Sequence, residues 1–232
     1  MSRIKLVAFD LDGTIGDTIP LCIEAFKKAV QPYVGYELSD NEVTQTFGVN
    51  EEGMIRRILG TPCKDFALKD FYAIYGHLHK QICPQPFPGI RELITALKQR
   101  GILVALVTGK GMKSCEITLR QFKMNTLFDK VLTGDAERNI KSDALKQLLK
   151  DYGLSADEAV YIGDTVSDII ECEKINVVCL SAAWGISSSA ALESNNPKNV
   201  FYSISSLSDF LKEREKNGFR LSRFSEGINL LT

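Results

Sequence analysis

The hydrophobic positions of this chain form short apolar runs separated by longer stretches with helical periodicity. Several of the short runs are apolar at every position, which is typical of strands in a parallel sheet that helices cover on both faces. The runs are residues 5–9, 103–107, 130–132, 159–162, 177–180 and 199–202. Each is followed by a turn and a helical pattern, so the sequence predicts βα units and an α/β fold.

The helical patterns carry recognisable ends. Apolar residues recur at helical spacing over residues 90–97, and Gly101 is placed to end that helix in a left-handed cap. The same pattern over residues 145–152 closes at Gly153. After about residue 207, the sequence predicts an amphipathic helix and then a polar end.

Residues 18–87 interrupt this alternation, because they show helical periodicity and almost no strand pattern. Residues 39–42, Ser-Asp-Asn-Glu, form a capping-box pattern that begins one helix. Three prolines between residues 84 and 88 indicate a stiff segment leading back to the sheet. We therefore predict a helical domain at 18–87, inserted into an α/β core formed by 1–17 and 88–232.

Composition narrows the class of protein. The 232 residues are 44% hydrophobic and 25% charged, as expected for one or two globular domains. Lys and Arg number 28 against 29 Asp and Glu, which leaves no broad basic field for nucleic acid or anionic lipid. The sequence has no apolar run long enough for a membrane span and begins with no signal-peptide pattern. Its six cysteines form no CxxC pair, so we expect no zinc site and reduced thiols in the cytoplasm.

Two carboxylates follow the first predicted strand. Asp10 and Asp12 flank Leu11, and Gly13 allows a tight turn directly afterwards. Ligands bind beyond the carboxyl ends of parallel strands, so both side chains would face one site. Carboxylates this close repel unless a divalent cation binds one of them or one keeps a proton. The same pattern also fits a strand-ending turn or part of a calcium loop.

Three further strand ends carry polar residues. Thr108 and Gly109 follow the second strand just before a helix, which favours an anion site. Lys141 follows the third strand at the start of a helix, where a cation is unfavourable to the helix dipole. Asp164 and Asp168 follow the fourth strand. Each motif alone also fits a structural role, but together at one sheet edge they predict an active site.

These four motifs, in this order, resemble those of the haloacid dehalogenase-like superfamily. The resemblance covers nearly the whole chain and includes the helical insertion, which corresponds to a cap domain in one subclass. Residues 86–90 are similar to the segment where that subclass re-enters its core. The chain most resembles phosphoglycolate phosphatases. The resemblance implies a Rossmann-like core with a helical cap, and a Mg²⁺-dependent phosphatase for a small phosphorylated metabolite such as 2-phosphoglycolate.

The resemblance also implies a catalytic role for each motif. Asp10 would attack phosphorus and form an aspartyl-phosphate. Asp12 would act as general acid for the leaving alcohol and then as general base for water. Thr108, Gly109 and Lys141 would bind the phosphoryl oxygens.

The metal ligands are implied in the same way. Mg²⁺ would be bound by the Asp10 carboxylate, the Asp12 carbonyl oxygen and Asp164. Asp168 would orient Lys141 or a metal-bound water from behind.

Two positions depart from the family pattern. The family's lysine is usually followed by proline, whereas Lys141 precedes Ser142, so Lys130 and Lys146 remain alternatives. Beyond the last acid pair, the family usually has a glycine where this chain has Asn176, which can also adopt the left-handed conformation.

Members of the superfamily also catalyse other reactions, which give alternative predictions for this chain. Asp12 favours phosphate chemistry over dehalogenation, because an ester intermediate with carbon needs no acid for a leaving alcohol. A sugar-phosphate mutase keeps all four motifs, and a silent binding protein could keep the fold. A phosphonatase would need a lysine in the insertion that forms a Schiff base; the candidates are Lys27, Lys28, Lys64 and Lys69.

Few residues of the insertion predict a function. Arg56 and Arg57 could bind a substrate carboxylate or lie on a solvated helix face. His77 and His79 lack a third metal ligand, which favours ordinary core or surface histidines. Trp184, in the core, is expected to pack rather than to act in catalysis. The oligomeric state is not predicted.

Overall fold

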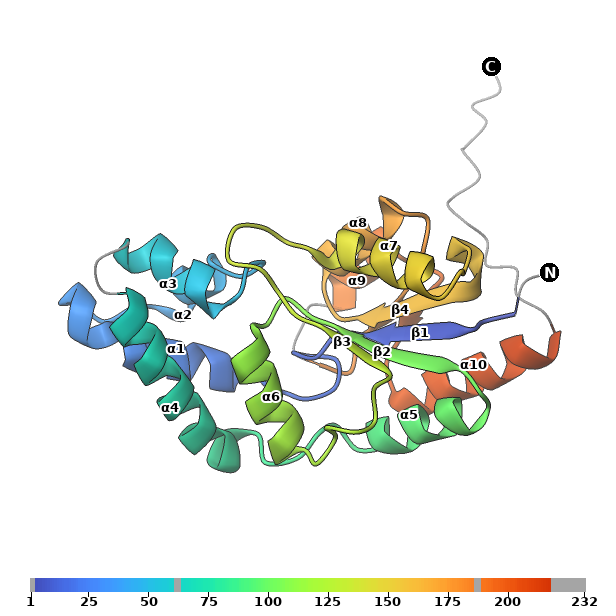
Figure 1. The fold of residues 1–232 in the computed structure, drawn as a ribbon, viewed down its shortest axis with the longest axis horizontal. Helices are drawn as coiled ribbons and strands as arrows, with labels where there is room; N and C mark the ends of the chain where they lie inside the picture. The colour runs from blue at the N-terminus through green and yellow to red at the C-terminus, as the bar shows by residue number, and fades with distance from the viewer. Residues whose placement is uncertain (1–2, 61–63, 186–188, 218–232) are drawn as a thin grey trace, which may run out of the picture.

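The computed structural model describes residues 3–60, 64–185 and 189–217; Cys63 and the predicted polar end of the tail lie outside this part of the chain. The chain forms a six-stranded parallel sheet with helices on both faces (Figure 1). The strand order is β3-β2-β1-β4-β5-β6. The predicted α/β class is therefore confirmed.

Each predicted strand is present within about two residues of its predicted ends. The strands are β1 (Leu6–Phe9), β2 (Leu103–Val107), β3 (Lys130–Leu132), β4 (Ala159–Gly163), β5 (Val178–Ala182) and β6 (Val200–Phe201). Val7 of β1 pairs with Val104 on one side and Val160 on the other. All strands run parallel, so their carboxyl ends lie at one edge. Chain order reverses between β1 and β4, which is where such sheets bind ligands.

Alternating residues of β1 face two different hydrophobic clusters. Leu6 and Ala8 pack with residues of α7 and α8, whereas Val7 and Phe9 pack with residues of α5 and α10. Figure 1 shows these helix pairs on opposite faces of the sheet. The core helices are α5 (Ile90–Gln99), α6 (Met112–Gln121), α7 (Lys141–Asp151), α8 (Val166–Glu173), α9 (Ser189–Asn195) and α10 (Ile204–Asn217), with a short 3₁₀ helix, η1 (Ala156–Glu158), before β4.

The insertion contributes four further helices: α1 (Ile19–Val34), α2 (Asp40–Thr44), α3 (Glu51–Leu59) and α4 (Lys64–Ile82). The predicted capping box is present, because the Glu42 amide donates to Ser39 Oγ and the Ser39 amide donates to the Glu42 carboxylate. The described residues between 18 and 87 contain no strand. In Figure 1 these helices lie beyond the carboxyl ends of the strands. The division of the chain into two domains stays a prediction.

The insertion packs directly on the core through α4 and α6. Tyr75 and His79 of α4 both bond to the hydroxyl of Thr118 on α6, at 2.8 and 3.1 Å. The His79 ring also lies edge-on against Phe122, with ring centroids 5.2 Å apart. One buried hydrophobic cluster runs without interruption from β1 through these helices. The insertion and the α/β core therefore share one buried hydrophobic cluster at this contact.

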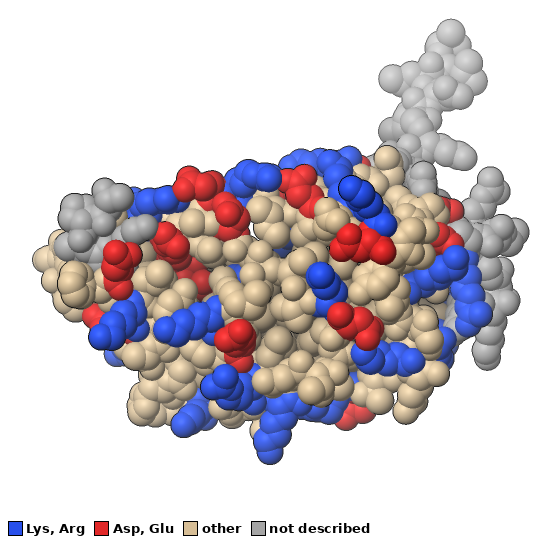
Figure 2. All heavy atoms as spheres, viewed as in Figure 1, with Lys and Arg blue, Asp and Glu red and all other residues tan. Residues whose placement is uncertain are grey.

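The surface carries charges of both signs. Figure 2 shows Lys and Arg side chains interspersed with Asp and Glu over the face in view. Among the helices of the described residues, none is long and apolar enough to cross a membrane.

We expect the protein to lose stability as pH falls below about 6.5, through His79. Burial lowers the pKa of His79 from its ordinary value of 6.5. A His pKa lowered by folding means that the neutral ring stabilises the fold fully above that value, and that this contribution is lost as pH falls. Urea unfolding at pH 7.5 and 5.5 should therefore show a smaller pH effect in His79→Gln than in the wild type.

The matched control is His77→Gln, which changes an exposed histidine on the same helix. It should keep the full pH effect. An unchanged pH effect in His79→Gln would contradict the assignment.

Candidate active site

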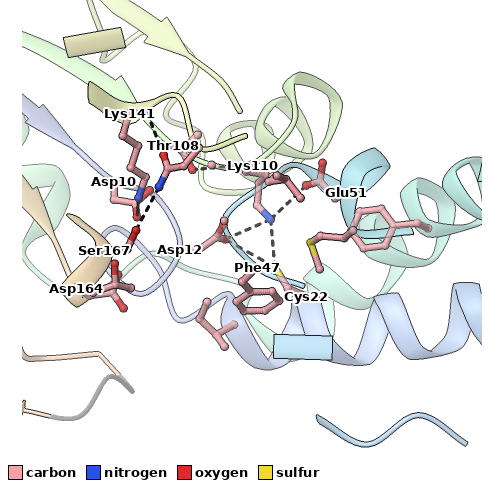
Figure 3. Close-up of a pocket in the computed structure, with 18 residues that line it drawn as sticks. Asp10, Asp12, Cys22, Phe47, Glu51, Thr108, Lys110, Lys141, Asp164 and Ser167 are labelled. Carbon is pink, nitrogen blue, oxygen red and sulfur yellow. Dashed lines mark hydrogen bonds and ion pairs between the residues drawn. The ribbon is translucent and has the colours of Figure 1, made fainter. Parts of the chain in front are cut away.

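The predicted site residues meet at the carboxyl edge of the sheet (Figure 3). They border a cavity of about 270 Å³. The predicted residues that line it are Asp10, Asp12, Thr108, Gly109, Lys141 and Asp164. Asp168 lies behind Lys141 and is fully buried. The structure thus brings together Asp10 and Asp168, which are 158 positions apart in the chain.

Lys141 lies between two carboxylates. Its Nζ is 2.7 Å from Asp10 Oδ2 and 2.5 Å from Asp168 Oδ1. Burial alone would lower the pKa of Lys141, but Asp10 and Asp168 outweigh it and raise that pKa above its ordinary value. Lys130 and Lys146 are exposed, so geometry favours Lys141 for the phosphate-binding position.

Asp10 is held in place from two directions. Its Oδ1 accepts a hydrogen bond of 2.7 Å from the Leu11 amide, and its Oδ2 accepts one from Lys141. Burial raises the pKa of Asp10 to about 6, although Lys141 acts in the opposite direction. A carboxylate in this setting has a fixed orientation and little water around it.

Asp168 has a second structural task. Its Oδ2 accepts hydrogen bonds from the amide and hydroxyl of Thr165, at 3.0 and 2.7 Å, which completes a capping box at the start of α8. Both carboxylate oxygens are therefore occupied, one by Lys141 and one by the helix start. This arrangement favours the predicted supporting position of Asp168.

Asp10, Asp164 and Asp168 form an acidic group that fits a divalent cation. Carboxylate oxygens of the three lie within 4.8 Å of one another, and all three residues are buried. The turn after β1 packs closely on this group: a Cβ at Gly13, which has φ +76°, would lie 2.1 Å from Asp164 Oδ2. Mg²⁺ in proteins is commonly held by one or two carboxylates. That part suits Asp10 and Asp164, because both oxygens of Asp168 already accept hydrogen bonds from Lys141 and Thr165.

Asp12 points away from that group and toward the insertion. Its Oδ1 accepts a hydrogen bond from the Thr18 hydroxyl and lies 3.3 Å from Lys110 Nζ. Cys22 Sγ contacts the same oxygen at 3.8 Å. All of these contacts are made to Oδ1, so the two aspartates flanking Leu11 have different partners.

A family model described as haloacid dehalogenase-like hydrolase matches residues 7–182. The chain belongs to this hydrolase family. The recognition of the family from its four motifs is confirmed. In this hydrolase the matched segment includes every predicted site residue and the whole insertion.

Relatives and solved structures agree with this assignment. The phosphoglycolate phosphatase of Vibrio parahaemolyticus is 31% identical over 220 residues, which cover 88% of this chain and 94% of that protein. The pyrophosphatase PpaX of Bacillus cereus is 24% identical over 217 residues, 93% of this chain and 100% of that one. The predicted class of enzyme, a phosphatase-like hydrolase, is therefore confirmed.

The fold is also shared. The crystal structure of a predicted phosphoglycolate phosphatase from Haemophilus somnus superimposes with a TM-score of 0.76 at 23% identity. The match covers 92% of this chain and 99% of that one.

Lys110 and Glu51, two residues without a predicted role, also line the cavity of the hydrolase. Lys110 Nζ lies 3.8 Å from Glu51, 3.1 Å from Cys22 Sγ and 4.7 Å from the centre of the Tyr75 ring. Burial alone would lower the pKa of Lys110, but Asp12 and the other neighbours raise it well above its ordinary value. Lys110 could have been predicted as a site residue from its position in the sequence, because it lies two residues after Thr108 at a strand end.

Glu51 anchors α3 to the core. Its carboxylate accepts hydrogen bonds from the Gly111 amide, at 2.9 Å, and from the Ser114 hydroxyl at the start of α6. A Cβ at Gly111 would lie 2.4 Å from the same carboxylate, so glycine permits this approach. Asn50 adds a backbone bond to Asp135 in the loop after β3, at 2.9 Å.

The remaining candidates of the insertion lie outside the cavity. Arg56 donates to the Ala136 carbonyl oxygen and pairs with Glu137, at 2.9 and 2.8 Å. Arg57 donates to the Thr46 carbonyl oxygen at 2.9 Å. Both arginines are thus bound to protein groups.

Of the lysines considered for a Schiff base, the three with described side chains, Lys27, Lys28 and Lys69, do not line the cavity either. Lys27 pairs with Asp40 and Lys28 with Glu24, whereas Lys69 is exposed and the side chain of Lys64 lies outside the described residues. Trp184 donates to the Thr14 carbonyl oxygen at 3.1 Å and packs on the core, as expected of a packing residue.

We expect Lys110→Met to destabilise the fold by about 3–5 kcal/mol, because it removes the buried cation that contacts both Asp12 and Glu51. The free energy of urea unfolding measures the effect. Lys113→Met is the control, since Lys113 is an exposed lysine in the first turn of α6, three residues after Lys110, and its loss should change stability little. Equal effects of the two substitutions would refute the role given to Lys110.

Proposed function

We propose that this hydrolase is a Mg²⁺-dependent phosphatase that hydrolyses a small phosphomonoester through an aspartyl-phosphate on Asp10. The observation that carries the proposal is the buried Asp10 carboxylate, fixed 2.7 Å from the Lys141 ammonium and beside Asp164, at the edge of one cavity. A fixed carboxylate next to a cation and a cluster of oxygen donors suits attack on a phosphoryl group.

In the first step, an Asp10 oxygen attacks phosphorus and the bond from phosphorus to the leaving oxygen breaks. Lys141 and the buried Thr108 hydroxyl bind the phosphoryl oxygens, and the Gly109 turn borders them. Negative charge that develops on these oxygens is stabilised by donors that need not reorient, because Asp168 already holds Lys141 in place.

Asp12 transfers the proton in both steps. Its Oδ1 is occupied by Thr18 and Lys110, so Oδ2 is the oxygen that donates a proton to the leaving alcohol. In the second step, the same oxygen takes a proton from water, the water oxygen attacks phosphorus, and the bond from phosphorus to the Asp10 oxygen breaks. Free Asp10 and inorganic phosphate result.

Mg²⁺ would be held by the carboxylates of Asp10 and Asp164 and by the backbone carbonyl oxygen of Asp12, with Asp168 behind. A bound divalent cation supplies positive charge that offsets the charge of the phosphoryl group as Asp10 approaches it. The buried carboxylates within 4.8 Å of one another support this assignment.

Two relatives carry phosphoglycolate phosphatase as their name. 2-Phosphoglycolate, the substrate predicted from the sequence, is therefore the reference ester with which other phosphomonoesters are compared. We also propose that the enzyme acts in the cytoplasm, a compartment that keeps thiols such as those of Cys22, Cys83, Cys115, Cys172 and Cys179 reduced.

The decisive experiment measures phosphate release from 2-phosphoglycolate, sugar phosphates, nucleotides and pyrophosphate, with Mg²⁺ and with EDTA. We expect Mg²⁺-dependent release that Asp10→Asn lowers by roughly 10³-fold or more, since the nucleophile is removed.

Asp151→Asn makes the same chemical change at an exposed acid of α7 and should leave release unchanged. Release that survives Asp10→Asn would exclude the aspartyl-phosphate route. Isomerisation of a sugar phosphate without free phosphate would indicate a mutase instead.

A further inference from the structure

The cavity has two chemically different ends. At the sheet edge it is bordered by the polar residues that we assign to the phosphoryl group and the metal. The opposite end is bordered by residues of the insertion, most of them apolar: Ile19 and Cys22 of α1, Phe47, Gly48 and Val49 before α3, Glu51 and Met54 of α3, and Phe71 of α4. Figure 3 shows Phe47 and Cys22 on the insertion side and Lys141 and Asp164 on the sheet side, with Asp12 between. The leaving alcohol must occupy the insertion end.

The positive charge at the insertion end is already compensated. Among the described residues that line the cavity, Lys110 and Lys141 are the cations, and Lys141 belongs to the sheet side. Lys110 contacts both Asp12 and Glu51, and only 2% of its side chain is exposed. Turning this ammonium toward a substrate would leave two carboxylates without their cation, which is costly in a buried setting.

The arginines of the insertion add no charge to that end. Arg56 is bound to the loop after β3, and Arg57 to the backbone before α3. A carboxylate or second phosphoryl on the leaving group would therefore lie near Asp12 and Glu51 without a cation of its own. Like charges at this distance repel, more strongly so where water is excluded.

Building on the proposed function, we propose that the substrate is the phosphate ester of a small, partly apolar alcohol that carries no negative charge of its own. Its carbon chain lies against Phe47, Val49, Met54 and Phe71. The cavity of about 270 Å³ is at the small end of ligand pockets, which favours an alcohol of a few carbons. This preference for a leaving group without negative charge distinguishes the chain from relatives named for phosphoglycolate and pyrophosphate. The leaving groups of those two compounds carry a second anionic group.

The test compares kcat/KM for three esters of similar size with Mg²⁺: n-propyl phosphate and 2-hydroxyethyl phosphate, which are neutral beyond the phosphate, and 2-phosphoglycolate, which is anionic. We expect the better neutral ester to exceed 2-phosphoglycolate by about tenfold or more, mainly through KM. A kcat/KM for 2-phosphoglycolate that equals or exceeds those of both neutral esters would overturn this proposal and leave the phosphatase intact. Hydrolysis of none of the esters or of pyrophosphate would refute the phosphatase itself.

A substitution of Phe47 tests the assignment of the insertion end. Phe47 is half-buried, so an arginine there can reach the cavity without entering the core. Phe47→Arg should raise the ratio of kcat/KM for 2-phosphoglycolate over n-propyl phosphate by about tenfold, and Phe47→Ala should lower kcat/KM for n-propyl phosphate alone. Tyr36→Arg is the control on an exposed site of the insertion and should leave the ratio unchanged. If folded Phe47→Arg and Phe47→Ala both keep the wild-type ratio, the alcohol does not lie there.

Discussion

The arrangement of the site depends on one buried ammonium group. Lys141 bridges Asp10, at the end of β1, and Asp168, in the first turn of α8. Two buried carboxylates this close would repel without the cation. Burying all three groups costs solvation free energy, and that cost is offset because each charge has a partner at hydrogen-bonding distance. The ion group therefore ties together the strand end and the helix start on either side of the point where strand order reverses.

A second ammonium group organises the other end of the cavity. Lys110 gathers Asp12 from the core and Glu51 from the insertion, and its contacts to both are within 4 Å. Asp10 and Asp12 are separated by one residue, yet they face different cations. Two carboxylates with different surroundings can take different parts in one reaction, which is the physical basis for assigning nucleophile and general acid separately.

The sequence predicted those features that local chemistry decides. Apolar runs identified the strands, because strands buried on both faces need apolar residues throughout, and Ser39 identified a helix start through its own capping bonds. The site residues of the core were predictable because parallel strands bring their carboxyl ends to one edge. Burial, which the sequence does not reveal, distinguished Lys141 from the exposed Lys130 and Lys146. Glu51 was missed because its partner Ser114 is 63 positions away, and only the packing of α3 on α6 brings them together.

The position of Glu51 also explains why two groups of residues in the insertion cannot vary independently: those that border the cavity and those that bind the insertion to the core. Within the first turn of α3, Glu51 binds the start of α6, and Met54 borders the cavity. Asn50, just before this helix, bonds to the loop after β3. A change that enlarges or polarises the cavity at this turn therefore also alters the contacts that position the helix. Phe47 and Val49 directly precede this turn. The contacts that fix the turn to the core therefore limit how far these two residues can move relative to the leaving alcohol. Selectivity in this chain is consequently a property of how the insertion is fixed to the sheet, as well as of which side chains face the substrate.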